Sequence, residues 1–154
     1  MGKLRIPHDS LILVGDGRKA LFLRNKGDEL HPHFVVERAM RDEPNPSTRE
    51  QGADRPGRVY GGTSVGTTAR RSGVGQTDWH VAEEQHFARH VAGLLEGLIR
   101  SRHVHSVVVV APPRALADLR KAFHPDVRRR ILAELDKDLT KHPIDEIEQL
   151  LTGP

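Results

Sequence analysis

The feature that most constrains the fold is the short apolar run Ser106-Val107-Val108-Val109-Val110-Ala111, which Pro112-Pro113 ends. Its length suits a strand better than a helix. Consecutive valines place apolar side chains on both faces of that strand, so both faces must be covered. Covering both faces of a sheet requires elements packed on each side of it. The run therefore predicts a layered α/β domain with this segment as a central strand.

Three segments ahead of this run have the length and the turn signals of strands. Leu11-Ile12-Leu13-Val14 is followed by Asp16-Gly17, which favours a tight hairpin turn. Residues 19–25 form the returning strand, and residues 33–40 supply a third strand after a further turn signal. We expect these three strands to form an antiparallel meander.

Apolar residues at helical spacing predict helices on either side of the central strand. The longest runs from an N-cap at Asp78 to about Ser101. Residues 116–123 form the next helix, and Val127, Ile131 and Leu132 mark a short second one. A last helix follows Pro143, which suits a first helical turn. The order of strands and helices predicts a mixed sheet flanked by helices.

Residues 41–77 have no apolar periodicity, and seven glycines lie between Gly52 and Gly75. A compact domain keeps such a long connection when it is functional or disordered. Between residues 41 and 75, six arginines less four acidic residues leave a charge of +2, and there is no lysine. Guanidinium groups hydrogen-bond phosphate oxygens in pairs, whereas a solvated loop with internal ion pairs is the alternative. The arginines expected to contact phosphate are Arg55, Arg58, Arg70 and Arg71.

The length, net charge and cysteine content of the chain exclude several classes of protein function. A chain of 154 residues suits one domain over 1–154. The net charge of +3 permits a nucleic-acid partner without requiring one. The absence of cysteine excludes disulfide frameworks, thiolate zinc sites and cysteine nucleophiles. Without an apolar signal segment or a long apolar stretch, we expect a cytoplasmic protein with no membrane partner.

Several segments carry a resemblance to a known family. They are residues 16–25 (DGRKALFLRN), 49–58 (REQGADRPGR), 76–80 (QTDWH), 110–114 (VAPPR), 119–121 (LRK) and 136–140 (DKDLT). Together they resemble the bacterial host attachment proteins, a bacterial branch of the archaeo-eukaryotic release-factor-like superfamily. The resemblance implies an RNase H-like mixed β-sheet of about five strands with flanking helices, like the middle domain of those release factors and of Pelota. It also implies a fifth strand near residues 135–139.

The same resemblance bears on function. In the release factors, a loop before the long helix carries Gly-Gly-Gln, which promotes hydrolysis of the peptidyl-tRNA ester. The similar position here reads Gly73-Val74-Gly75-Gln76, and the β-branched Val74 resists backbone conformations that glycine allows. We therefore favour a non-catalytic module without a cofactor that associates with the ribosome, structured RNA or tRNA from the cytosol. Its effect on attachment to host cells would be indirect.

Residues near the start of the long helix leave two other functions open. A peptidyl-tRNA or ester hydrolase would use Gln76 to position water and His80 as a base oriented by Glu84. Trp79 can stack on a base, although a lone Trp at a helix start more often packs on the core. Helical spacing places His80 in line with Val91, on the inner face. A regulatory protein-interaction module is the third possibility.

Metal binding is the less favoured interpretation of the histidines. Glu83, His86 and His90 share a helical stripe, and His31-Pro32-His33 is a further pair. Ten scattered histidines make such spacings common by chance, so no metal site is predicted. The Gly15-Asp16-Gly17 segment lacks the strand–loop–helix context of a nucleotide-binding motif and is interpreted as a tight turn.

Overall fold

The computed structural model describes residues 4–42 and 72–153. Packing divides the chain into two compact units, one of residues 1–41 with 84–154 and one of residues 42–83. The first unit contains the sheet and every helix that covers it, including the part of the long helix from Glu84 onward. The predicted single domain over 1–154 stays a prediction.

The described residues of the first unit form a five-stranded mixed sheet in the order β3-β2-β1-β4-β5. β1 pairs antiparallel with β2, and β2 pairs antiparallel with β3, as the predicted meander requires. β1 also pairs parallel with β4, and β4 pairs parallel with β5. The bounds are β1 Leu11–Gly15, β2 Lys19–Asn25, β3 Phe34–Arg41, β4 Val107–Val110 and β5 Ile131–Leu135.

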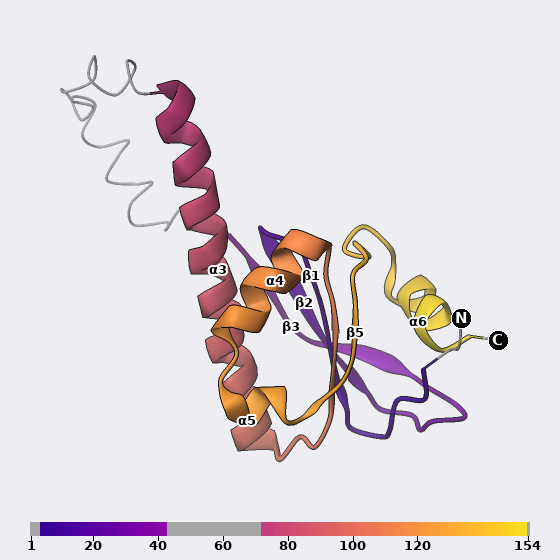
Figure 1. The fold of residues 1–154 in the computed structure, drawn as a ribbon. Helices are drawn as coiled ribbons and strands as arrows, with labels where there is room; N and C mark the ends of the chain where they lie inside the picture. The colour runs from indigo at the N-terminus through magenta and orange to yellow at the C-terminus, as the bar shows by residue number, and fades with distance from the viewer. Residues whose placement is uncertain (1–3, 43–71, 154) are drawn as a thin grey trace, which may run out of the picture. The chain divides into compact units, whose positions relative to one another are not determined.

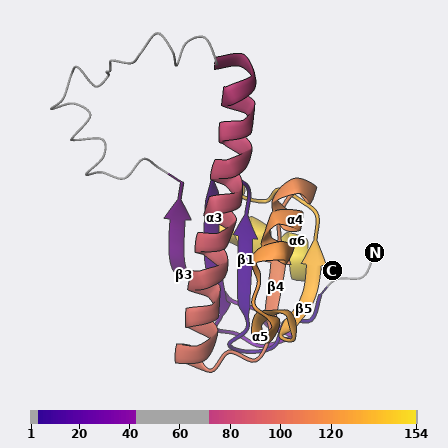
Figure 2. The ribbon, with the colours of Figure 1, turned by 60° about the vertical axis from the view of Figure 1, so that its left-hand side comes forward.

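Helices cover both faces of this sheet (Figures 1 and 2). The long helix from Glu84 onward lies with α4 and α5 on one face, and α6 covers the other. The bounds are α3 Ser72–Arg102, α4 Pro113–Ala122, α5 Pro125–Arg128 and α6 Ile144–Thr152. The prediction of an α/β fold with a mixed sheet and flanking helices is confirmed.

Successive side chains of the central strands point to opposite faces of the sheet, which divides the hydrophobic core into two layers. On β1, Leu11 and Leu13 face α3 and α4, whereas Ile12 and Val14 face α6. The four valines of β4 divide in the same way, and all four are fully buried. The central strand is therefore covered on both faces, as its continuous apolarity predicts.

A buried charge network stabilises the outer part of the meander. The side chain of Arg24 is only 5% exposed, and its Nε donates to Glu37 Oε1 at 3.1 Å. Glu37 is the extra residue on β3 where the β2–β3 register shifts, and its other oxygen lies 3.0 Å from Arg102. Because a buried guanidinium is costly without a counter-charge, Glu37 stabilises Arg24 in the sheet.

The long helix begins earlier than predicted. Its helical backbone starts at Ser72, so the proposed N-cap at Asp78 is wrong and Gly73 to Gln76 belong to the helix. Glycine costs a helix about 1 kcal/mol relative to alanine but does not end it as proline does. No proline lies between Pro56 and Pro112, so the glycines alone did not justify a loop up to Thr77.

The segment after α4 also differs from the prediction. α5 ends at Arg128, and Ile131 and Leu132 belong to β5 instead of a helix. The strand predicted near residues 135–139 therefore lies four residues earlier. The N–H of Val107 donates to the carbonyl of Arg130 at 2.8 Å. This bond begins the pairing of β5 with β4, at a point where helical spacing alone predicted that the helix continues.

Candidate functional site

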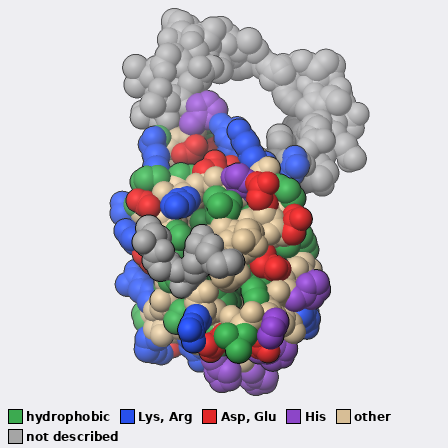
Figure 3. All heavy atoms as spheres, turned by 90° about the vertical axis from the view of Figure 1, so that its right-hand side faces the viewer, with side chains coloured by type: hydrophobic (Ala, Val, Ile, Leu, Met, Phe, Trp, Pro, Cys, Tyr) green, Lys and Arg blue, Asp and Glu red, His purple; other side chains and the backbone are tan. Residues whose placement is uncertain are grey.

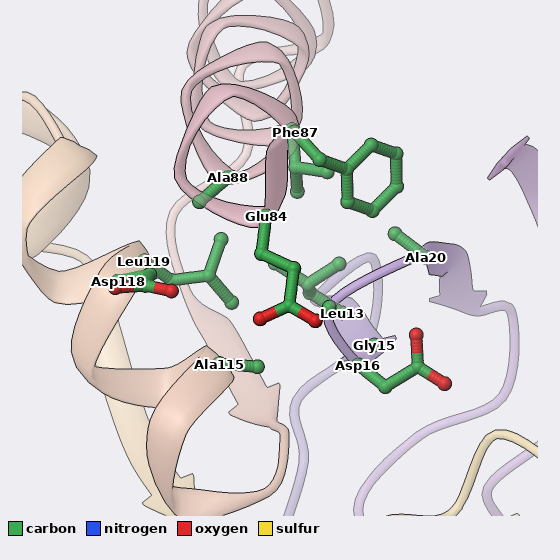
Figure 4. Close-up of a pocket in the computed structure, with 12 residues that line it drawn as sticks. Leu13, Gly15, Asp16, Ala20, Glu84, Phe87, Ala88, Ala115, Asp118 and Leu119 are labelled. Atoms are coloured by element: carbon green, nitrogen blue, oxygen red, sulfur yellow. The ribbon is translucent and has the colours of Figure 1, made fainter. Parts of the chain in front are cut away.

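A small pocket lies beyond the carboxyl end of β1, between the hairpin that leads to β2 and the helices α3 and α4. Open α/β sheets bind ligands most often at such a point, beyond the carboxyl ends of the strands. The lining comes from the β1–β2 turn, α3 and α4 (Figure 4). The lining residues are Leu13, Gly15, Asp16, Gly17, Ala20, Glu84, Phe87, Ala88, Val91, Ala115, Asp118 and Leu119.

Asp16 has a structural role at this pocket. Its Oδ1 accepts hydrogen bonds from the N–H groups of Arg18 at 2.7 Å and Lys19 at 2.8 Å, which closes the hairpin turn. Its Oδ2 accepts from the Thr140 hydroxyl at 3.3 Å, and this bond joins the turn to the segment between β5 and α6. The interpretation of Gly15-Asp16-Gly17 as a tight turn is confirmed.

Glu84, one of the predicted site residues, points into the pocket. Figure 4 shows its carboxylate between Leu13 and Ala115, while the carboxylate of Asp16 points away from it. A Cβ added to Gly17 would lie 3.0 Å from Glu84 Cδ, so glycine at this position allows the close approach. Among the described residues, no hydrogen bond or ion pair to the Glu84 carboxylate is present.

The charged side chains in the lining of this pocket are all carboxylates. The pocket lining contains three carboxylates but no histidine, lysine, serine or threonine, and a general base needs a partner that orients it or receives the proton. Within residues 4–42 and 72–153, no three His, Asp or Glu side chains are placed to hold a metal ion. The pocket is a small hollow with three carboxylates in an otherwise apolar lining.

Two histidines near the β2–β3 connection, His8 and His31, have local contacts. Figure 3 shows histidine side chains gathered at the lower end of that view. His8 Nδ1 lies 2.7 Å from the Gly27 carbonyl oxygen, and His31 Nδ1 lies 3.8 Å from Asp28. The pKa of Asp28 is lowered, first by the N–H of His31, which donates to its carboxylate. These contacts shape the β2–β3 connection.

Several predicted site residues fall where side chains are not placed. Arg55, Arg58, Arg70 and Arg71 lie outside the described residues, so their proposed phosphate contacts stay predictions. Gly75 and Gln76 lie in the helical backbone of α3.

Trp79 and His80 are both more exposed than the sequence predicted. Trp79 is 62% exposed, so its interpretation as a core-packing residue is wrong. His80 is exposed too, whereas spacing placed it on the inner face. Among the described side chains of α3, from residue 79 onward, the buried positions begin at Phe87, which explains why a periodicity extrapolated back to residue 80 assigned the wrong face.

A basic hollow beside β5 was missed by the sequence reasoning. It lies between α4, α5 and β5, and its lining residues are Arg120, Lys121, Phe123, Arg128, Ile131 and Glu134. The available signal was the density of positive charge: residues 120–130 contain five arginines and lysines against one aspartate. Helical spacing in that stretch predicts helices but does not indicate the charge of the surface that they form.

Comparison with known proteins places the chain in a family. The model of a family described as "protein required for attachment to host cells" matches residues 11–151. The chain belongs to this family. A search of curated proteins found no significant match. Among the described residues, no helix of this family member combines the length and apolarity needed to cross a bilayer.

Proposed function

We propose that this member of the host attachment family is a non-catalytic module that binds RNA, with the ribosome or structured RNA as its target in the cytosol. The observation that carries the proposal is the exposure of Trp79, the only tryptophan of the chain. Base–aromatic stacking contributes roughly 1–3 kcal/mol per base. A large aromatic surface left in solvent is therefore better explained by a stacking partner than by packing.

Arginines that precede Trp79 in the sequence also favour RNA as the partner. Arg70 and Arg71 precede it by nine and eight residues, and Arg55 and Arg58 lie further upstream in the same lysine-free segment. Arginines supply phosphate contacts that bind without reading sequence and that weaken with salt. We infer that stacking by Trp79 and phosphate contacts by these arginines act together on one strand of RNA.

The fold supports the RNase H-like part of the proposal. A three-stranded meander, a long helix, an apolar strand, helices and a further strand follow one another in the order that the family resemblance implies. The helical backbone at Gly75 and Gln76 favours the non-catalytic form of the proposal, because the release-factor motif acts from a loop. Action from the cytosol would make the effect on attachment to host cells indirect.

Binding of a fluorescently labelled, unpaired RNA oligonucleotide tests the proposal. We expect Trp79→Ala to weaken binding about fivefold or more, as the loss of one stacked base requires. Leu30→Ala is the matched control, because Leu30 is an exposed apolar residue in the other compact unit, at 74% exposure. Equal affinities of wild type and Trp79→Ala would refute the stacking role. Hydrolysis of a peptidyl-tRNA analogue that Gln76→Ala abolishes would favour the hydrolase alternative instead.

A further inference from the structure

The sheet has an open edge at β5. Among the described residues, no strand pairs with the outer side of β5, which ends the strand order (Figure 2). Along such an edge, every second residue directs its N–H and C=O groups away from the sheet. Four of the five residues, Ile131-Leu132-Ala133-Glu134-Leu135, are apolar, and Leu132 is 48% exposed. An apolar edge of this kind can pair with another strand.

The other edge of the sheet is better protected. β3 carries Glu37, Arg38 and Arg41, and charges on an edge strand oppose pairing with another chain. β5 carries only Glu134, whose charge is balanced by Arg120 at 2.6 Å. Its register shift with β4 is confined to Leu132, and residues 133–135 pair regularly. β5 is therefore the edge more open to pairing.

The basic hollow adjoins this open edge. Phe123 and Ile131 supply its apolar floor, and Phe123 is almost completely buried, at 3% exposure. A strand added to β5 would lie along the hollow, because Ile131 and Glu134 belong both to the strand and to the lining. The edge and the hollow therefore form one continuous surface.

The charges around the hollow do not cancel. Arg120 is paired with Glu134, and Asp126, the acid of α5, contacts Arg100 and Arg129. Lys121 and Arg128 have no carboxylate partner among the described residues. Arg128 instead donates to the carbonyl oxygen of Arg120 at 2.8 Å. The surface is complementary to acidic side chains.

We propose that β5 and the basic hollow form a docking site for an extended acidic peptide segment of a partner protein, which adds to the sheet as a sixth strand. Its backbone pairs with β5, an apolar side chain packs on the partly exposed Ile131, and acidic side chains face Lys121 and Arg128. RNA fits this surface less well, because the aromatic ring in its lining is buried and the strand edge offers backbone groups that pair with a peptide. This docking site uses none of the residues assigned to RNA binding.

The test is a titration of the full-length ¹⁵N-labelled chain with a short peptide of alternating valine and glutamate, followed by NMR. We expect shift changes at the amides of residues 131–135. The double variant Lys121→Glu/Arg128→Glu should bind about tenfold more weakly, the effect of two exposed charge pairs. Arg5→Glu/Lys26→Glu is the matched control, because it reverses two exposed charges elsewhere in the same unit and should bind like wild type.

A peptide with N-methylated backbone amides separates strand pairing from simple charge attraction without altering the protein. We expect it not to bind, because it cannot donate hydrogen bonds to β5.

The proposal is overturned if the unmodified peptide leaves the β5 amides unshifted at millimolar concentration or if the methylated peptide binds equally well. It is also overturned if an RNA oligonucleotide shifts the same amides in place of the peptide. A doubled molecular mass that excludes the peptide would show that a second copy of the chain occupies the edge instead.

Discussion

Asn25 is the polar residue whose loss should most perturb the meander. Its side chain is fully buried: Oδ1 accepts from the N–H groups of Gly27 at 3.0 Å and His33 at 2.9 Å, and Nδ2 donates to the Ile6 carbonyl at 2.8 Å. Asn25→Ala removes all three bonds. One bond is fully buried and two are partly buried, so we expect a loss of roughly 2–4 kcal/mol in the free energy of unfolding.

Asn25→Asp gives a result with a distinct pH dependence. A carboxylate retains the two acceptor bonds but places a charged oxygen against the Ile6 carbonyl, so the protonated carboxyl is favoured and its pKa is raised in the folded state. Because the folded pKa exceeds the unfolded value of about 3.9, the stability of this variant should fall as pH rises above about 4. Urea unfolding followed by circular dichroism measures both variants, with exposed Gln85→Ala as control. An Asn25→Ala loss below about 0.5 kcal/mol, or an Asn25→Asp stability that follows the wild-type pH profile, would refute the reasoning.

Three further predictions concern stability and solvent exposure. Glu37→Gln removes the nearer of two carboxylates that pair with the buried Arg24, the other being Asp9 at 3.8 Å. It should cost about 2–4 kcal/mol in urea unfolding, and a loss below about 1 kcal/mol would contradict this. The pKa of Asp138 is lowered, first by the hydrogen bond from the Thr140 hydroxyl and then by that from the Thr140 N–H. Its stabilising contribution is present above the unfolded pKa of about 3.9 and is lost as pH falls through the folded pKa. Asp138→Asn should therefore flatten the decline of stability below about pH 4, and an unchanged acid profile would argue against it. Trp79 should show red-shifted emission that iodide quenches in the folded chain, whereas blue-shifted, protected emission would contradict its exposure.

The sheet was predictable because its signals are local. The Asp16-Gly17 turn fixes the hairpin, and the continuous apolarity of residues 107–110 identifies the strand covered on both faces. β5 was harder to predict because its position depends on a distant pairing. Ile131 and Leu132 continue the helical spacing of Val127, and only pairing with β4 places them in a strand. Sequence pattern alone does not include that long-range contact.

The site was less predictable than the fold. Glu84 was identified as a candidate, but its place over Gly17 depends on how α3 packs against the β1–β2 turn. The exposure of Trp79 depends on where the buried face of α3 begins, which its local spacing does not reveal. The excess of positive charge in residues 120–130 was visible in the sequence, but the hollow appears only when α4, α5 and β5 come together.

Salt-dependent sedimentation with ribosomes tests the central claim most directly. Wild type should co-sediment at low salt and dissociate as salt rises, because phosphate contacts release counterions. Arg55→Ala/Arg58→Ala should bind more weakly and with a shallower salt dependence. The slope of the logarithm of the binding constant against the logarithm of the salt concentration should fall by about 0.7–0.9 for each lost phosphate contact. Arg5→Ala/Lys26→Ala, which removes the same charge from the other compact unit, should behave like wild type. Absence of co-sedimentation at low salt, or identical behaviour of wild type and Arg55→Ala/Arg58→Ala, would contradict the proposed binding to the ribosome through these arginines.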